Sequence, residues 1–180
     1  MAYSSIGHMG FALVGLASGS LAGVKGVIIY LAIYLAMTAG TFACILAMRR
    51  REGAVEDIDE LAGLAKRNPM FAFLLAMLMF SLAGVPPLAG FFGKFYVFLA
   101  AIEAQLYGLA VLGVLSSVVG AFYYLRIVKI MYFDEPAEAF EPMPGALRTV
   151  LALSSVVVIL FFLVPGPLVA AADSAARSLF

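Results

Sequence analysis

The sequence predicts an all-α integral membrane protein, a bundle of about five transmembrane helices, from three observations. The 180 residues are 64% hydrophobic and 12% charged, with a mean hydropathy of +1.08. Soluble domains are nearer half apolar and a quarter charged. The charges gather in short stretches that separate long uncharged runs. One run, 70–104, is too long for a single straight crossing and carries its own break.

The run 70–104 is the one around which the other spans are arranged. A continuous helix over it would be about 52 Å long, against a hydrocarbon core of about 30 Å. Pro86 and Pro87 lack amide protons, so they would leave the carbonyls of Leu82 and Ala83 without helical partners. We therefore expect two half-helices joined by an unwound segment that is buried in protein or lines a wet cavity. The half-helices are expected over roughly 70–84 and 91–104, with a bend permitted by Gly84, Gly90 and Gly93.

Lys94 lies a few residues after this break and is the only charge between Arg67 and Glu103. An ammonium near the bilayer centre costs roughly 2.5–3.5 kcal/mol on insertion scales, so a partner or an ion path normally accompanies it. The alternative is a lysine that snorkels to the interface and has no function. We favour a functional lysine, because ionisable groups beside broken membrane helices usually serve ion transfer.

The other spans are expected over about 4–24, 26–48, 106–132 and 148–170, with a short turn at Lys25 and another near Gln105. His8 follows Ser4 by one helical turn. It either locks helices together by hydrogen bonds or takes part in proton transfer. The second span carries a polar stripe that we interpret as interhelical glue rather than a water chain: Tyr30, Tyr34, Thr38 and Thr41. A group of tyrosines in the fourth span fits an interfacial aromatic belt: Tyr123, Tyr124 and Tyr132.

Two charged stretches, 49–69 and 134–146, connect the spans. In the first, Asp57 and Glu60 have capping-box spacing, which predicts a short surface helix with solvated charges that ends by Pro69. The second combines carboxylates and prolines, as in an exposed extended loop.

Five crossings place eight basic residues on one side and two on the other, with Lys94 inside the membrane. The positive-inside rule then makes the N-terminus and both charged loops cytoplasmic and the C-terminus periplasmic. The eight are Arg49, Arg50, Arg51, Lys66, Arg67, Arg126, Lys129 and Arg148, and the two are Lys25 and Arg177.

Composition also excludes several classes of site. The net charge of +0 argues against a nucleic-acid partner. Cys44 is the single cysteine, so we expect a packing residue and no thiolate metal site. Residues 1–24 lack the basic start of a signal peptide, and we treat 1–180 as one transmembrane domain.

Four stretches together resemble one family, and the resemblance runs over essentially the whole chain. They are AYSSIGHMGF (2–11), DELAGLAKRNP (59–69), SLAGVPPLAGFFGKFYVF (81–98) and YYLRIVKIMYF (123–133). The chain resembles the subunit N family of bacterial respiratory complex I, antiporter-like proton-translocating subunits of NADH:quinone oxidoreductase. The family fold has fourteen membrane helices in two inverted five-helix repeats. The resemblance implies that this chain corresponds to the last five, with 70–104 as the broken helix of the second repeat.

The resemblance also assigns roles to three residues. It implies that Lys94 loads and releases a proton, that His8 relays protons along a central polar axis, and that Tyr34 acts through water where a sister subunit has histidine. NADH, FMN, iron–sulfur clusters and quinone would be bound by the other membrane and peripheral subunits of complex I, with this chain in the bacterial inner membrane. The family's first nine helices are absent from this sequence, so Met1 is interpreted as an internal methionine of a longer reading frame. The alternative is a split gene, in which a partner chain supplies the rest. The segment alone is not expected to pump.

Two other functions remain open from the residues. A multi-subunit cation/proton antiporter or a membrane-bound hydrogenase would share the broken helix. A purely structural bundle would use Lys94 as a buried ion-pair residue.

Overall fold

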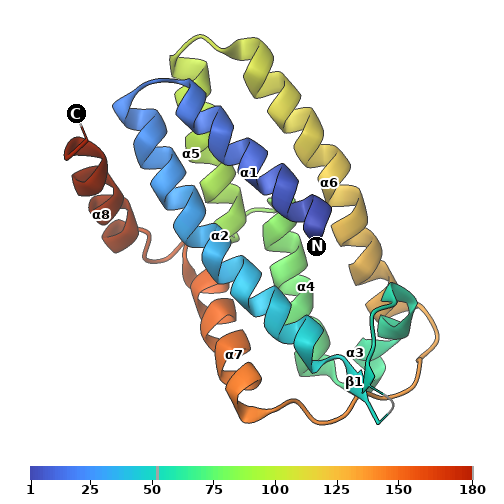
Figure 1. Cartoon of the computed structure of the whole chain (residues 1–180). Helices are drawn as coiled ribbons and strands as arrows, with labels where there is room; N and C mark the ends of the chain where they lie inside the picture. Colours follow the sequence, from blue (N-terminus) through green and yellow to red (C-terminus); the bar gives the residue numbers. More distant parts are fainter. Residues whose placement is uncertain (52, 180) are drawn as a thin grey trace.

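The computed structural model describes residues 1–51 and 53–179, and this part of the chain is helical apart from one small hairpin (Figure 1). The hairpin pairs β1 (Arg49–Arg50) with β2 (Gly53–Ala54) in antiparallel register. The helices in chain order are α1 (Ala2–Ala17), α2 (Leu21–Ala47), the 3₁₀ helix η1 (Ile58–Leu61), α3 (Leu64–Arg67), α4 (Pro69–Ala83), α5 (Ala89–Glu103), α6 (Tyr107–Phe133), α7 (Gly145–Leu160) and α8 (Gly166–Arg177).

Helix α2 is the centre of the bundle, because it packs against α1, α4, α5, α7 and α8. Its apolar side chains are buried at helical spacing, and Ile29, Ile33 and Met37 are at most 1% exposed. Gly26 lets α5 approach, since a Cβ there would lie 3.2 Å from the carbonyl carbon of Tyr96. Cys44 is free and fully buried in the same core, as expected of a packing residue.

The run 70–104 is broken as predicted, into α4 and α5. Gly84 ends α4 in the left-handed conformation, with φ of 91° and its amide donating to the carbonyls of Phe80 and Ser81. Helix α5 begins at Ala89, after the two prolines. Each half has 15 residues and is about 22 Å long, so neither half alone spans a hydrocarbon core of about 30 Å.

The turn expected at Lys25 is wrong. The chain turns at residues 18–20, where Gly19 has φ of 59° and the Ser20 hydroxyl accepts from the Gly23 amide at 3.1 Å. Lys25 lies inside α2 and forms an ion pair with Asp173 of α8 at 3.0 Å. A left-handed glycine followed by a serine cap ends one helix and begins the next. A single lysine, in contrast, is compatible with a turn or with the interior of a helix.

The short helix expected from the Asp57–Glu60 spacing is also wrong in detail. Asp57 caps the 3₁₀ helix by accepting from the Asp59 amide at 3.2 Å. The Glu60 carboxylate does not complete a capping box and instead accepts from Arg50 at 2.6 Å. The short helix α3 ends at Arg67, before Pro69, as expected. Pro69 also begins α4, because the missing amide proton costs nothing at the first helical position. Several charges of this stretch are therefore paired, not merely solvated.

The last uncharged run does not form one continuous helix. Helix α7 ends at Leu160 and α8 begins at Gly166, since Pro165 and Pro167 interrupt the ladder of helical hydrogen bonds. Helix α8 is held to α2 by the Lys25–Asp173 pair, and Arg177 also donates to Asp173 at 2.7 Å. Hydrogen bonds from Arg177 and Lys25 lower the pKa of the Asp173 carboxyl. The turn predicted near Gln105 is confirmed, with φ of 59° at that residue.

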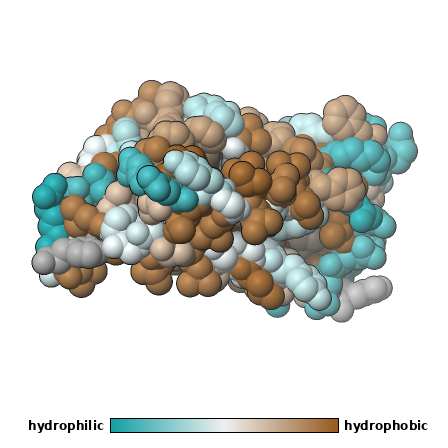
Figure 2. Space-filling model, turned by 90° about the horizontal axis from the view of Figure 1, so that it is seen from above, coloured by the Kyte–Doolittle hydropathy of each residue, from teal (hydrophilic) through white to brown (hydrophobic). Residues whose placement is uncertain are grey.

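Within the described residues, α2 and α6 are long and apolar enough to cross a membrane, and α4 and α7 are shorter apolar helices. Only 17% of the most apolar window of α6 is buried. In the space-filling view, hydrophobic residues cover most of the middle of the molecule and hydrophilic ones gather toward its two ends (Figure 2). This distribution is the one expected if the hydrocarbon core of a bilayer surrounds the middle of the bundle.

Candidate functional site

Lys94 is buried at the start of α5 and turns back toward the break between the half-helices. Its side chain is 7% exposed. The Nζ atom donates to the carbonyl oxygens of Leu82 and Ala83, both at 3.0 Å, and to the Ser117 hydroxyl of α6 at 2.7 Å. The ammonium has three N–H donors, and all three find acceptors here.

The two carbonyls that bind Lys94 are those that Pro86 and Pro87 leave without helical amides. The prolines therefore leave two carbonyl acceptors free, and the Lys94 ammonium donates a charge-assisted hydrogen bond to each of them. This arrangement rules out the snorkelling alternative. Among the described residues no carboxylate pairs with Lys94, and the structural ion-pair hypothesis stays untested.

Two neighbours shape the space around the ammonium. The Phe11 ring of α1 lies with its centroid 4.9 Å from Nζ, within cation–π range. Gly84 lies against the stem, since a Cβ at that position would be 3.1 Å from Cδ of Lys94. A side chain at residue 84 would push the lysine away from the carbonyls.

An open cavity of about 380 Å³ between α5 and α6 reaches the same group, with Gly84, Lys94 and Ser117 among its lining residues. Val85, Pro86 and Pro87 themselves are exposed. The unwound segment thus borders a cavity, as expected, but its proline loop is not covered by the described part of this chain.

His8 joins three helices through both of its ring nitrogens. Nδ1 is 2.5 Å from the Tyr30 hydroxyl of α2, and Nε2 is 3.1 Å from the Tyr124 hydroxyl of α6. The imidazole is 2% exposed, and the Tyr124 hydroxyl is also hydrogen-bonded to Ser4. Of the two interpretations of His8, the structure supports the hydrogen-bonded lock directly, while proton transfer remains a prediction.

Tyr34 lies beside this network without joining it. Its hydroxyl donates to Ser5 at 3.0 Å, and its ring stacks on His8 with centroids 4.9 Å apart. Thr41 donates back to the Met37 carbonyl at 2.8 Å within its own helix. The bonds of Tyr30 and Tyr34 to α1 bear out interhelical glue for that part of the stripe.

A small cavity of about 50 Å³ connects the two polar centres, because both His8 and Lys94 line it. Ser4, Ser117 and Tyr124 provide hydroxyl groups on its wall. A water needs roughly 10–15 Å³ of such space and two to four polar partners. The cavity can therefore hold a few waters between the lysine and the histidine.

Residues 1–120 match the profile of a family described as "NADH:quinone oxidoreductase/Mrp antiporter, TM". The chain belongs to this antiporter family. It is similar to NADH-quinone oxidoreductase subunit N of Parvibaculum lavamentivorans, with 68% identity over 99% of this chain and 37% of that protein. Subunit N 1 of Rhizobium meliloti is 65% identical over 100% of this chain and 38% of its own length. The chain thus spans less than two fifths of these relatives.

Solved structures extend the likeness to the fold. Respiratory complex I from Thermus thermophilus with bound NADH contains a chain that matches with a TM-score of 0.79 and 29% identity, over 99% of this chain and 39% of that one. The Mrp complex from Dietzia sp. matches with a TM-score of 0.83 over 96% of this chain and 40% of that one. Its identity is 24%, so this second match shows the fold alone.

Gly90 and Gly93, which follow the break between α4 and α5, lie where helices approach each other closely. A Cβ on Gly90 would be 1.9 Å from the Ser81 carbonyl oxygen, and the Gly90 amide donates to the Ser81 hydroxyl at 2.9 Å. A Cβ on Gly93 would be 3.0 Å from the Tyr30 ring. Both positions hold α5 tightly against its neighbours, and a side chain is excluded at residue 90.

Three residues of the candidate site were missed by sequence reasoning. Ser117 and Phe11 were not among the candidate residues. Tyr124 was placed in an interfacial belt, but it is 2% exposed and bonds to His8. Tyr124 directly follows Tyr123 in α6, and neighbouring helix positions face different directions. This spacing could have indicated that the two tyrosines do not share one environment. Within the described residues, no group of three or more potential ligands could hold a metal ion.

Proposed function

We propose that this chain is a segment of the proton-translocating subunit N of NADH:quinone oxidoreductase, with Lys94 as the group that loads and releases a proton. The observation that carries the proposal is the contact of Lys94 with two carbonyls freed by a helix break. Similarity to relatives named subunit N supports the choice of complex I. NADH, FMN, iron–sulfur clusters and quinone would belong to partner subunits, so the chain contributes proton transfer rather than redox chemistry.

The contact with the carbonyls couples protonation to structure. A protonated Lys94 offers three donors to three acceptors. Deprotonation removes one donor, so one buried acceptor loses its partner at a cost of about 1–3 kcal/mol. This cost favours a rearrangement of the helix break or the entry of a water that binds the free acceptor. A change of charge elsewhere in the assembly can act on the same equilibrium through Lys94.

The path toward Lys94 would run through His8. The shared cavity of about 50 Å³ and the hydroxyls of Tyr30 and Tyr124 support a relay by side chains and water. Tyr34 would contribute through water, since its hydroxyl contacts Ser5 and not the imidazole.

We further propose five membrane crossings, formed by α1, α2, the broken pair α4–α5, α6, and α7 with the segment that follows. They correspond to the last five helices of the fourteen-helix fold. The ends of α2 and α6 and the starts of α4 and α7 meet at one end of the bundle, next to the hairpin and α3 (Figure 1). The excess of arginine and lysine at that end supports a cytoplasmic face, a periplasmic C-terminus and a place in the bacterial inner membrane.

The second candidate is a subunit of a cation/proton antiporter. The family description covers both kinds of machine, and the fold is as close to the Mrp complex as to complex I. The proposed site would serve either, because a lysine held by a broken helix needs no redox partner.

A mild detergent purification through a C-terminal tag on the native gene separates the two candidates. We expect an assembly that oxidises NADH with a quinone and shows flavin and iron–sulfur absorbance. Membrane subunits without redox centres, together with ion-driven proton flux, would instead establish the antiporter. The copurified chains also report whether a longer gene product contains this segment.

Replacing Ser117 with alanine is expected to slow proton transport about tenfold, because a hydrogen bond to a charged group contributes about 1.5–3 kcal/mol. The loss removes one of the three acceptors of Lys94. Transport is measured as proton uptake in vesicles, normalised to the amount of assembly. Thr149→Ala is the matched control, since Thr149 is exposed, donates only to the Gly145 carbonyl of its own helix and lines none of the cavities described. Equal transport in the two variants would remove Ser117 from the site.

A further inference from the structure

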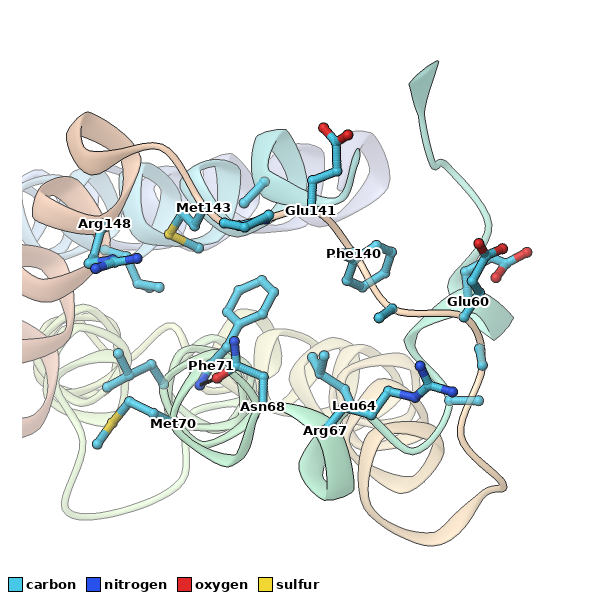
Figure 3. Close-up of a pocket in the computed structure, with 18 residues that line it drawn as sticks. Glu60, Leu64, Arg67, Asn68, Met70, Phe71, Phe140, Glu141, Met143 and Arg148 are labelled. Carbon is cyan, nitrogen blue, oxygen red and sulfur yellow. Dashed lines mark hydrogen bonds between the residues drawn. The ribbon is translucent and has the colours of Figure 1, made fainter. Parts of the chain in front are cut away.

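Helix α4 has different surroundings at its two ends. Its start, with Met70 and Phe71, lines a cavity of about 610 Å³ whose walls carry both arginines and glutamates, so the cavity has no single sign of charge (Figure 3). Its end lies inside the bundle, where Ser81 and Leu82 are fully buried. There the last turn of α4 meets the first turn of α5, directly beside Lys94.

The start of α5 has no capping side chain of its own. The residue at its N-cap position is Leu88, whose apolar side chain cannot accept a hydrogen bond. A capping side chain normally accepts from the amide of the second or third helical residue. The second residue of α5 is Gly90, and its amide donates to the Ser81 hydroxyl at 2.9 Å. Ser81 therefore caps α5 from a different helix, across the break.

The Ser81 hydroxyl is held on both sides. It accepts from Gly90 and donates to the Met37 sulfur of α2 at 3.0 Å. Ser81 is 0% exposed and Met37 is 1% exposed, so bulk water does not reach either contact. A buried donor that loses its acceptor carries the full cost of its desolvation. Three helices, α2, α4 and α5, thus meet at one hydroxyl group.

Ser81 is followed directly by the two residues that hold the lysine. The Lys94 ammonium donates to the carbonyls of Leu82 and Ala83, both at 3.0 Å. On α5, Gly90 and Lys94 are one helical turn apart and therefore lie on the same face. The two half-helices are joined by one contact at Ser81 and two contacts at the next two carbonyls. The first contact determines where the other two can form.

The packing of the two half-helices leaves little freedom for α5 to slide along α4. A Cβ on Gly90 would lie 1.9 Å from the Ser81 carbonyl oxygen, so the two backbones are in direct contact. The third acceptor of Lys94 is different, because Ser117 belongs to α6 and lies outside this joint. If the joint loosened, the ammonium would keep Ser117 and the cavity of about 380 Å³ beside it, but not the carbonyls of α4.

We propose that Ser81 is a positioning residue for Lys94: its hydroxyl sets the register between α4 and α5 that brings the ammonium to the two carbonyls. Without the hydroxyl, the Gly90 amide loses its acceptor, and the first turn of α5 must shift to reach another one. The contacts of Lys94 with α4 then loosen. The consequence for transport rests on the proposed role of Lys94 in proton transfer, whereas the consequence for the geometry does not.

The test measures the chemical reactivity of the Lys94 amine in the complete native assembly. Formaldehyde with a membrane-permeant borane reductant methylates accessible lysines, and peptide mass spectrometry gives the rate at each of them. Lys25, which is partly exposed, is the internal reference. We expect slow methylation of Lys94 in the native protein and about tenfold faster methylation in Ser81→Ala, the scale of one buried donor without an acceptor. Ser81→Cys should give an intermediate rate, because a thiol is a weaker acceptor than a hydroxyl.

Ser155→Ala is the matched control, because Ser155 is 2% exposed and its hydroxyl has no hydrogen-bond partner in the described part of the chain. This variant also removes a buried hydroxyl, but it should leave the methylation of Lys94 unchanged. Equal rates at Lys94 in the Ser81→Ala and Ser155→Ala variants would overturn the proposal. An equal acceleration at Lys25 would also overturn it, since it would show a general loosening of the bundle.

Proton uptake per assembled complex is the second measurement. Ser81→Ala should lower it about tenfold and should cause no comparable further loss when Lys94 is already replaced by methionine. Unchanged uptake in Ser81→Ala, together with a large loss in Lys94→Met, would overturn the positioning role alone. Normal uptake in Lys94→Met would instead overturn the proposed function, and the methylation rates would still decide the role of Ser81.

Discussion

Replacing Lys94 with methionine in the complete native gene product is expected to lower proton transport by about a hundredfold or more, the scale of losing a positioned proton-transfer group. Methionine keeps an unbranched apolar stem one atom shorter than that of lysine, and it offers no proton and no donor. The carbonyls of Leu82 and Ala83 would lose their partners, at a cost of about 1–3 kcal/mol for each if water does not replace the lysine. The measurement is proton uptake by vesicles per unit of assembled complex.

The control for this variant is Lys25→Met. Lys25 is also a lysine in an apolar helix, but it lies near the start of α2 and pairs with an aspartate at partly exposed positions. Surface pairs of this kind contribute about 0–1 kcal/mol, so transport should stay near that of the native protein. Normal transport in the Lys94 variant, with assembly intact, would show that this lysine carries no proton and would leave it a structural plug of the helix break.

Gly90→Ala is expected to have the largest effect on stability. The new Cβ would lie 1.9 Å from the Ser81 carbonyl oxygen and 2.7 Å from its carbon, so backbone of α4 or α5 must move. Overpacking of flexible cores costs about 1–3 kcal/mol, and a clash with backbone should exceed about 3 kcal/mol. We expect a large fall in the midpoint of thermal unfolding. A thiol-reactive dye can follow it at Cys44, which is fully buried, once any other cysteines of the protein are replaced.

Gly108→Ala provides the comparison, because a Cβ at this helical position meets nothing within 4 Å. Alanine is the better helix former, so unfolding should shift by no more than about 1 kcal/mol. If Gly90→Ala unfolds at the same temperature as the Gly108 variant, the close contact between α4 and α5 is not present in the native protein.

The break and its lysine could be predicted because their causes are local. Two adjacent prolines free two carbonyls wherever they occur in a helix, and a lone lysine in an apolar run needs a partner. The link between them could not be predicted, since it depends on how α5 folds back past α4. Ser117 and Phe11 reach the lysine from other helices, and no spacing within the sequence connects them to it.

The errors also have physical causes. Lys25 was given the role of a turn from its identity alone, yet the deciding groups were Gly19, which ends the preceding helix, and Ser20, which caps α2. Glu60 was assigned to a helix start, but an arginine from the hairpin offered a stronger partner. Local capping rules do not register such a partner, because Arg50 comes from another segment of the fold.

The hydrogen bonds of the His8 imidazole to its two tyrosine neighbours have a direction. A neutral imidazole carries one N–H, so of its two tyrosine neighbours, Tyr30 and Tyr124, one accepts from the ring and the other donates to it. A proton that enters at one nitrogen and leaves from the other exchanges these roles and reverses the polarity of the hydrogen bonds at both tyrosines. The next proton cannot follow in the same sense until the hydroxyls and the ring reorient. If His8 relays protons as proposed, this reorientation must follow every transfer, and the time it takes would limit how often the relay can be used.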